Sequence, residues 1–140
     1  MDNEYNKPIP RRDDLNGEFW AHCHNHELRF QRCSGCRTWR HLPREGCRQC
    51  GSFEWTWEQS SGKGEVFSWT VIHRALHPGF NEELPYAAVI IELEEGVRMV
   101  SHVVDVPTES LVVGQPVEVF FEDVTAEVSI PKFRQILGGP

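Results

Sequence analysis

The spacing of hydrophobic positions changes near residue 28. Before that point, residues 13–26 place apolar side chains at helical spacing, from Leu15 through Phe19 to His22 or Cys23. This period predicts a short helix, with one of the two aspartates at its start as the N-cap. After that point the period is that of β-strands, and no further helix is expected.

Alternating apolar and polar residues predict two groups of short strands, separated by the glycine-rich segment 60–64. The expected strands cover residues 28–32, 38–42 and 53–58 in the first group, and 66–73, 86–93, 97–104, 116–124 and 132–137 in the second. Five short strands without an intervening helix favour a small closed barrel of the OB type, because such a barrel curls on itself and leaves no exposed edge. The longest loop of this barrel, residues 74–85, joins its first two strands.

Four cysteines stand in two matched pairs with the spacing C-x2-C-x10-C-x2-C: Cys33, Cys36, Cys47 and Cys50. Each pair puts two thiolates on one turn, and two such turns complete a tetrahedral shell for zinc. Four thiolates leave no position for water, so we expect the metal to be structural. A segment this short buries too little apolar surface to fold alone, and metal binding supplies the missing stability.

Two other uses of the cysteines compete with structural zinc. A rubredoxin-like iron site has the same four thiolates, and the spacing does not distinguish it from zinc. A thioredoxin-type dithiol is not favoured, because it needs one C-x2-C motif beside a βαβ unit and not two matched pairs.

These patterns predict a mainly β protein in three parts. They are an N-terminal helical segment (residues 1–27), a rubredoxin-like zinc ribbon (28–60) and a five-stranded OB-fold barrel (61–140). No apolar run approaches the roughly 18 residues of a membrane helix, and the charged N-terminus lacks the apolar core of a signal peptide. We therefore expect no membrane contact and a cytoplasmic location, where paired cysteines bind metal in preference to forming disulfides.

Charge is unevenly distributed along the chain, whose net charge is −7. Residues 61–140 carry twelve acidic and five basic side chains, whereas residues 29–48 carry six arginines and one glutamate. Such a local basic face can meet phosphate although the whole protein is acidic. Arg40 and Arg44 are our candidate phosphate contacts, and solvated surface charge is the plainer alternative.

The run His22-Cys23-His24-Asn25-His26 resembles a metal site, but ligands that alternate at a helix end point in different directions. We interpret it as a polar helix end whose histidines suit the C-terminal dipole, and Cys23 as a small buried residue. No glycine-rich phosphate loop, GxSxG motif or paired carboxylate motif occurs. The sequence therefore indicates no catalytic site.

Four aromatic residues of the strands allow two readings: Trp55, Trp57, Phe67 and Trp69. OB barrels often stack nucleic-acid bases on such rings. However, the first two share one face of a strand, as do the last two, which favours packing in the core or between ribbon and barrel. The acidic barrel also opposes phosphate binding.

The order of these motifs resembles the family of zinc-ribbon and OB-fold proteins once catalogued only as a domain of unknown function. The resemblance covers residues 14–137. It rests on EFW in the helix, LRFQRCSGCRTWRHLPREGCRQCGS in the ribbon, W-x-x-x-SGKGEVFSWTVIH at the start of the barrel, and LPYAAVIIELEEGVRMVSHVV and VGQPVEVFFEDV in the later strands.

The resemblance implies a non-catalytic accessory subunit of a thiolase-superfamily enzyme (a thiolase, synthase or retro-aldolase). The partner would supply the catalytic residues, and the small subunit would stabilise it and help to form an acyl-CoA channel. On this hypothesis, Phe80, Pro85 and Tyr86 contact the acyl and pantetheine parts, while Arg40 and Arg44 face the CoA phosphates. The acyl group, the pathway and the stoichiometry stay open. The alternative function is an OB-fold module for single-stranded nucleic acid.

Overall fold

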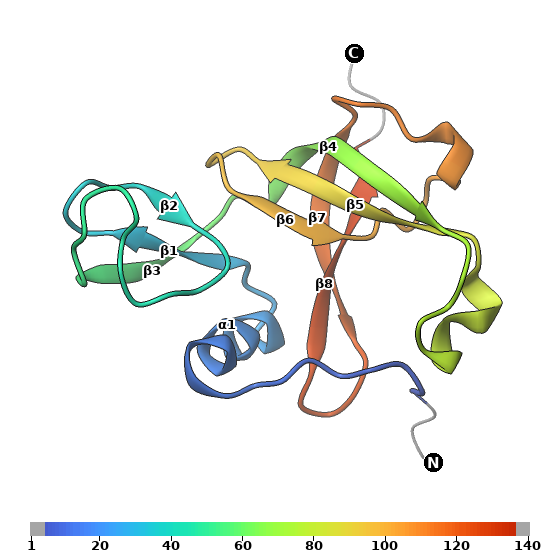
Figure 1. The fold of residues 1–140 in the computed structure, drawn as a ribbon, viewed down its shortest axis with the longest axis horizontal. Helices are drawn as coiled ribbons and strands as arrows, with labels where there is room; N and C mark the ends of the chain where they lie inside the picture. The colour runs from blue at the N-terminus through green and yellow to red at the C-terminus, as the bar shows by residue number, and fades with distance from the viewer. Residues whose placement is uncertain (1–4, 137–140) are drawn as a thin grey trace.

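Two β-sheets and one helix form the described part of the chain, residues 5–136, in this computed structural model (Figure 1). Helix α1 (Asp14–His24) precedes a sheet of order β2-β1-β3, made of β1 (Arg29–Cys33), β2 (Trp39–Arg40) and β3 (Trp55–Gln59). The second sheet has the order β6-β5-β4-β7-β8, made of β4 (Lys63–Ile72), β5 (Tyr86–Leu93), β6 (Arg98–Ser101), β7 (Pro116–Asp123) and β8 (Ser129–Gln135). Two 3-10 helices, η1 (Pro78–Glu83) and η2 (Thr108–Ser110), lie in the connections.

The second sheet curls until its two ends meet. Its named strands pair antiparallel, and the chain after β6 then runs parallel to β8. There Phe133 N–H donates to the carbonyl oxygen of His102 at 2.9 Å, and Val104 N–H donates to that of Phe133 at 2.9 Å. These bonds close the barrel, so the expected fold class, a helix and zinc ribbon before an OB-fold domain, is confirmed.

One hydrophobic core joins the helix, the ribbon and the barrel. Every second residue of β5 is buried, as the alternating pattern predicted. Phe19 of α1 and Phe30 of β1 belong to the same core cluster as Val89 and Phe133 of the barrel. The ribbon and the barrel are therefore packed together through α1, which lies between them in Figure 1.

Strand boundaries differ from the expected ones where backbone groups find other partners. Strand β2 has two residues in place of the expected 38–42, because the chain after it turns to bond Gln31. Strand β8 begins at Ser129, before Pro131, which pairs with Phe121 in an outer strand of the sheet where proline is tolerated. The expected end of this strand, residue 137, lies outside the described residues.

The loop 74–85 is more regular than expected. It contains η1, whose start is fixed by His77, since the ring Nδ1 accepts a hydrogen bond from Gly79 N–H at 2.9 Å. Helix α1 is also shorter than the expected 13–26. Asp13 is its N-cap residue, but its side chain makes no capping bond and contacts Arg11 at 2.9 Å. Among residues 5–136, no helix is long and apolar enough to cross a membrane.

The core predicts the cost of one aromatic truncation. Replacing Phe133, which is fully buried, with alanine should lower the free energy of unfolding of the zinc-loaded protein by about 3–5 kcal/mol. The matched control is Phe53→Ala, because Phe53 is 76% exposed, and its effect should stay within about 0.5 kcal/mol. Urea unfolding followed by circular dichroism measures both. Equal losses for the two variants would contradict this assignment of the core.

Candidate metal centre and neighbouring cavities

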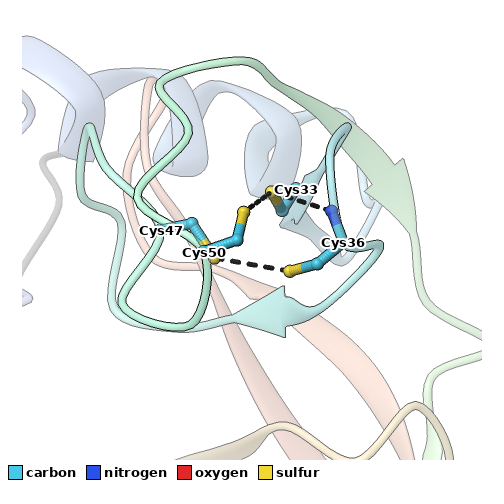
Figure 2. Close-up of side chains that lie close together, drawn as sticks. All are labelled: Cys33, Cys36, Cys47 and Cys50. Carbon is cyan, nitrogen blue, oxygen red and sulfur yellow. Dashed lines mark hydrogen bonds between the residues drawn. The ribbon is translucent and has the colours of Figure 1, made fainter.

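The four cysteines of the ribbon converge on one point (Figure 2). Cys33 ends β1, Cys36 lies in the following turn, and Cys47 and Cys50 lie in the loop before β3. Their sulfur atoms all lie within 4.8 Å of one another, with 3.6 Å between Cys33 and Cys50 and 3.6 Å between Cys36 and Cys47. A zinc ion with bonds of about 2.3 Å to four sulfurs separates them by about 3.8 Å, so the cluster fits tetrahedral zinc.

Backbone amides support the sulfur atoms in both turns. Gly35 N–H and Cys36 N–H point at the sulfur of Cys33, at 3.3 and 3.5 Å, and Gln49 N–H points at that of Cys47, at 3.3 Å. Donors aimed at a sulfur favour its thiolate form, which is the form that binds metal. The two C-x2-C turns are therefore built alike.

The thiols of the chain differ in their tendency to ionise, also within the centre. A backbone hydrogen bond with Ser52 lowers the pKa of Cys50, but side-chain hydrogen bonds with Cys33 and Cys36 together raise it to about 11. The hydrogen bond from Cys36 N–H is the main cause that lowers the pKa of Cys33, and bonds with Thr38 lower the pKa of Cys36 to about 6. Burial alone raises the pKa of Cys23 to about 12. Cys23 is fully buried in the core and stays a thiol at neutral pH. Four thiolates fill the coordination shell, so the zinc of this ribbon is structural.

The histidines at the end of α1 and just after it diverge. His22 contacts Trp57 edge-on, with ring centroids 5.3 Å apart. His26 lies 2.8 Å from the carboxylate of Asp123 and stacks on Phe121. Within residues 5–136, the four cysteines are the one group of three or more metal-binding side chains close enough to share an ion.

The tryptophans of β3 serve packing between ribbon and helix. Trp55 and Trp57 meet edge to face, 5.4 Å apart, and the indole N–H of Trp57 donates to Glu18 of α1 at 2.7 Å. Trp69 packs against the core of the barrel. These three rings therefore have structural roles.

Gln31 organises the arginine-rich loop of the ribbon, and sequence reasoning did not single it out. Its side chain is fully buried in β1. Its carbonyl oxygen accepts from Arg40 Nε at 3.0 Å and Arg44 N–H at 2.8 Å, and its amide donates to the carbonyl oxygen of Arg44 at 2.8 Å. The Nη2 atom of Arg40 also donates to the backbone carbonyl oxygen of Arg44, at 2.9 Å. The sequence of β1 did not mark Gln31 out, because Arg29 and Arg32 make the strand polar on both sides of it.

Three other ribbon arginines are paired with carboxylates. Arg29 contacts Glu27 at 2.7 Å, while Arg32 and Arg37 both contact Glu58, at 3.4 and 3.3 Å. The basic face expected from the sequence is thus partly neutralised within the chain.

An apolar cavity of about 560 Å³ lies where the ribbon meets the barrel, and no pattern in the sequence predicted it. We call it the junction cavity. Its walls come from α1 (Phe19, Trp20), the loop after β2 (Leu42, Pro43) and the barrel (Phe67, Met99). His41 also lines the junction cavity, and the centre of its ring lies 5.1 Å from the ring centres of both Phe19 and Phe30. Burial lowers the pKa of His41 to about 4. His41 is therefore neutral at neutral pH.

A second hollow of about 580 Å³ lies beside the first, and we call it the arginine groove. Its arginines are Arg40, Arg44, Arg48 and Arg98, the last from β6. No aspartate or glutamate is among its lining residues. The two candidate phosphate contacts, Arg40 and Arg44, therefore share one groove.

The three candidate channel residues also lie together, but far from the arginines. Phe80 and Tyr86 stack with ring centroids 5.3 Å apart, and Pro85 precedes Tyr86. Tyr86 is the first residue of β5, whereas the arginine groove is lined by the hairpin that follows the last residue of β5. The eight residues of this strand therefore separate the channel residues from the arginines. Figure 1 shows η1 and the ribbon on opposite sides of the barrel. The structure does not bring the two halves of the hypothesised channel together.

Family models match the two β-structured parts of the chain. One, described as "ChsH2, rubredoxin-like zinc ribbon domain", matches residues 20–56, and another, "ChsH2, C-terminal OB-fold domain", matches residues 57–122. The fold and the cysteine centre thus define a zinc-ribbon and OB-fold protein.

Curated relatives and a solved structure agree with this class. A "DUF35 domain-containing scaffold protein" of Methanocaldococcus jannaschii is 35% identical over 115 residues, which are 81% of either chain. A "Probable enoyl-CoA hydratase alpha subunit" of Thermomonospora curvata is 36% identical over 129 residues, 91% of this chain but 39% of that protein's length. A chain of a solved structure titled "Ltp2-ChsH2(DUF35) aldolase" is 34% identical, with a TM-score of 0.79 over 92% of this chain and 98% of that one. This chain belongs to the ChsH2/DUF35 family.

The metal centre predicts a direct loss of zinc. Cys36→Ser should release the ion and unfold the ribbon, because metal binding and folding of such a site are coupled. Elemental analysis should find about one zinc per chain in the parent protein and far less in the variant. Cys23→Ala is the control and should keep its zinc. Stoichiometric iron in the parent, with a red colour, would refute the zinc assignment.

The hydrogen bonds of the Gln31 side chain predict a separate loss of stability. Gln31→Leu keeps the size of the side chain but leaves Arg40 Nε and Arg44 N–H without their acceptor, which should destabilise the protein by about 1–3 kcal/mol. The control is Gln59→Leu, on an exposed position of β3. Thermal unfolding of the zinc-loaded proteins compares them. An unchanged stability for Gln31→Leu would remove the structural role given to Gln31.

Proposed function

We propose that this chain is a non-catalytic accessory subunit that binds a thiolase-like partner, stabilises it and contributes to an acyl-CoA binding channel. The observation that carries the proposal is the likeness, over 92% of this chain, to a chain of the structure titled "Ltp2-ChsH2(DUF35) aldolase". Relatives named as a scaffold protein and as a hydratase alpha subunit support the same class of role.

The residues themselves support a subunit without chemistry of its own. The zinc has four thiolate ligands and no open position at which water or substrate could be activated. Within residues 5–136, the one thiol outside the metal centre, Cys23, is fully buried and its pKa is raised to about 12. A buried thiol of that kind is a poor nucleophile.

The loop 74–85 is the surface that we propose for the partner. Leu76 is 92% exposed, more than any other large apolar residue described as exposed. The stacked pair Phe80 and Tyr86 lies in the same loop and at the start of β5, and Lys7 Nζ lies 5.3 Å from the centre of the Phe80 ring. An exposed apolar group on an ordered loop is a common feature of protein interfaces.

The alternative function, binding of single-stranded nucleic acid, gains no support from the barrel. Three of its five basic side chains contact carboxylates: Arg98 with Glu92, Lys132 with Glu122 and Arg134 with Glu118. Paired cations on an acidic domain attract a phosphate backbone weakly. The cytoplasmic location expected earlier stays part of the proposal, since a reducing compartment keeps the four thiolates available for metal.

The proposal predicts a specific co-purification. A tagged copy of the chain, isolated from its native host, should bring down a thiolase-superfamily protein in stoichiometric amount. Leu76→Asp should weaken this assembly, because it places a charge in an apolar contact, and so should the double variant Phe80→Ala with Tyr86→Ala. Val113→Asp, at a position 67% exposed on another loop, is the matched control and should assemble normally.

Isolation of the chain without a thiolase-like protein would contradict the proposed function. Normal assembly of both loop variants, with the partner present, would contradict only the placement of the interface on the loop 74–85.

A further inference from the structure

The segment before α1 reaches the loop 74–85 on the barrel. We call residues 5–12 the N-terminal strap. In Figure 1 the strap leads from α1 toward η1, which lies in this loop. Its contact with η1 joins residues that are 73 positions apart in the sequence, from Asn6 to Gly79. The strap therefore connects α1 to the loop.

At its far end, the backbone of the strap lies directly on Gly79. A Cβ atom on this residue would lie 2.5 Å from the carbonyl oxygen of Asn6 and 3.0 Å from the Cα atom of Lys7. Both distances are well below the normal separation of non-bonded atoms, so no side chain fits there. Gly79 does not have a positive φ. The close approach of the strap, and not the backbone conformation, is thus what requires glycine at this position.

At its near end, the strap lies on a second glycine. Gly17 is inside α1, where glycine destabilises a helix relative to alanine. A Cβ atom on Gly17 would lie 2.6 Å from the carbonyl oxygen of Arg12, the last residue of the strap. The contact with the strap explains why the helix contains this glycine. Both ends of the strap therefore lie where any side chain on the neighbouring element would meet backbone.

Lys7 adds a side-chain contact to the far end of the strap. Its Nζ atom pairs with the carboxylate of Glu83 and lies 5.3 Å from the centre of the Phe80 ring. The side chain of Lys7 is only 18% exposed, which is low for a lysine. Phe80 in turn stacks on Tyr86. The strap thus contacts the aromatic pair of the loop as well as its backbone.

The loop itself contains little that would keep it ordered. None of residues 74–85 is buried, and η1 has six residues. A short segment with so little buried surface opens easily unless another part of the chain holds it. The contacts of the strap with Gly79, Phe80 and Glu83 supply that support.

We infer that the N-terminal strap holds the loop 74–85 in its observed conformation and so prepares it for binding. The second part of this inference rests on the proposed function, in which the loop is the surface for the partner. A loop that is already ordered loses less conformational freedom when a partner binds, and the strap therefore favours assembly without contacting the partner itself.

The first test changes the loop and observes the strap. Trypsin cleaves after Arg11, whose side chain is 87% exposed, but cleavage needs the surrounding backbone to come free of the protein. Gly79→Ala should speed cleavage of the zinc-loaded full chain after Arg11 by about tenfold, because the added methyl group displaces Asn6 and Lys7. Asn81→Ala, at an exposed position of the same 3-10 helix, is the matched control and should be cleaved at the parent rate.

The second test changes the strap and observes the loop. Phe80 N–H donates to the carbonyl oxygen of His77 at 3.0 Å and reports the opening of η1. Lys7→Gln should speed hydrogen exchange of this amide by about fivefold, because the loop loses its ion pair and its cation–π contact. Lys63→Gln, at an exposed position of β4, is the control and should leave the exchange unchanged. Zinc content and circular dichroism verify that each variant folds.

Co-purification with the thiolase-like partner then tests the role of the strap in assembly. Lys7→Gln and Gly79→Ala should each retain less partner than the two control variants. Parent-level assembly by variants whose loop is demonstrably released would overturn this role.

The hold of the strap on the loop is overturned if Gly79→Ala leaves cleavage unchanged, if Lys7→Gln leaves exchange unchanged, or if the controls change as much. These two measurements use the chain alone, so they decide the inference whether or not a partner is found. Absence of a thiolase-like partner, with both measurements as expected, would refute the proposed function and preserve the strap.

Discussion

The convergence of four thiolates on one metal is the constraint on which the arrangement of the ribbon depends. The three ribbon strands contain two, five and five residues, and their loops carry little buried apolar surface. A sheet of this size does not hold long loops in place by packing alone. The metal closes the two C-x2-C turns. The loop between the turns is then short enough for Gln31 to fix both Arg40 and Arg44.

The fixed ribbon in turn determines the surface next to it. Phe30 of β1 and Phe19 of α1 bring the ribbon against the barrel through a shared core. The contact between the ribbon and the barrel leaves a space next to that core, and this space is the junction cavity. Loss of the metal should therefore affect the cavity and the groove as well as the ribbon, because both are walled in part by the loop that the cysteines hold.

Local patterns predicted local features well. The cysteine spacing predicted the metal centre, and period-two alternation predicted the buried face of β5. The family resemblance also predicted the order of the zinc ribbon and the OB-fold domain along the chain. Features that depend on long-range contacts were missed. Gln31 looks like an ordinary polar residue in the sequence, and only the fold brings its side chain to Arg40 and Arg44. The junction cavity is formed by segments up to 116 positions apart, from Asn16 to Lys132. Phe80 and Tyr86 stack on each other. Their distance from the arginines is set by β5 and could not be read from the composition of the loop.

We propose that this chain assists an enzyme without being one. The most direct measurement compares acyl-CoA turnover by the purified chain, by its thiolase-like partner and by the two reconstituted together. We expect no turnover by the chain alone, and a partner whose turnover or lifetime in solution increases when the chain is added. Turnover by the chain alone, or a partner whose activity and stability are the same with and without it, would refute the accessory role.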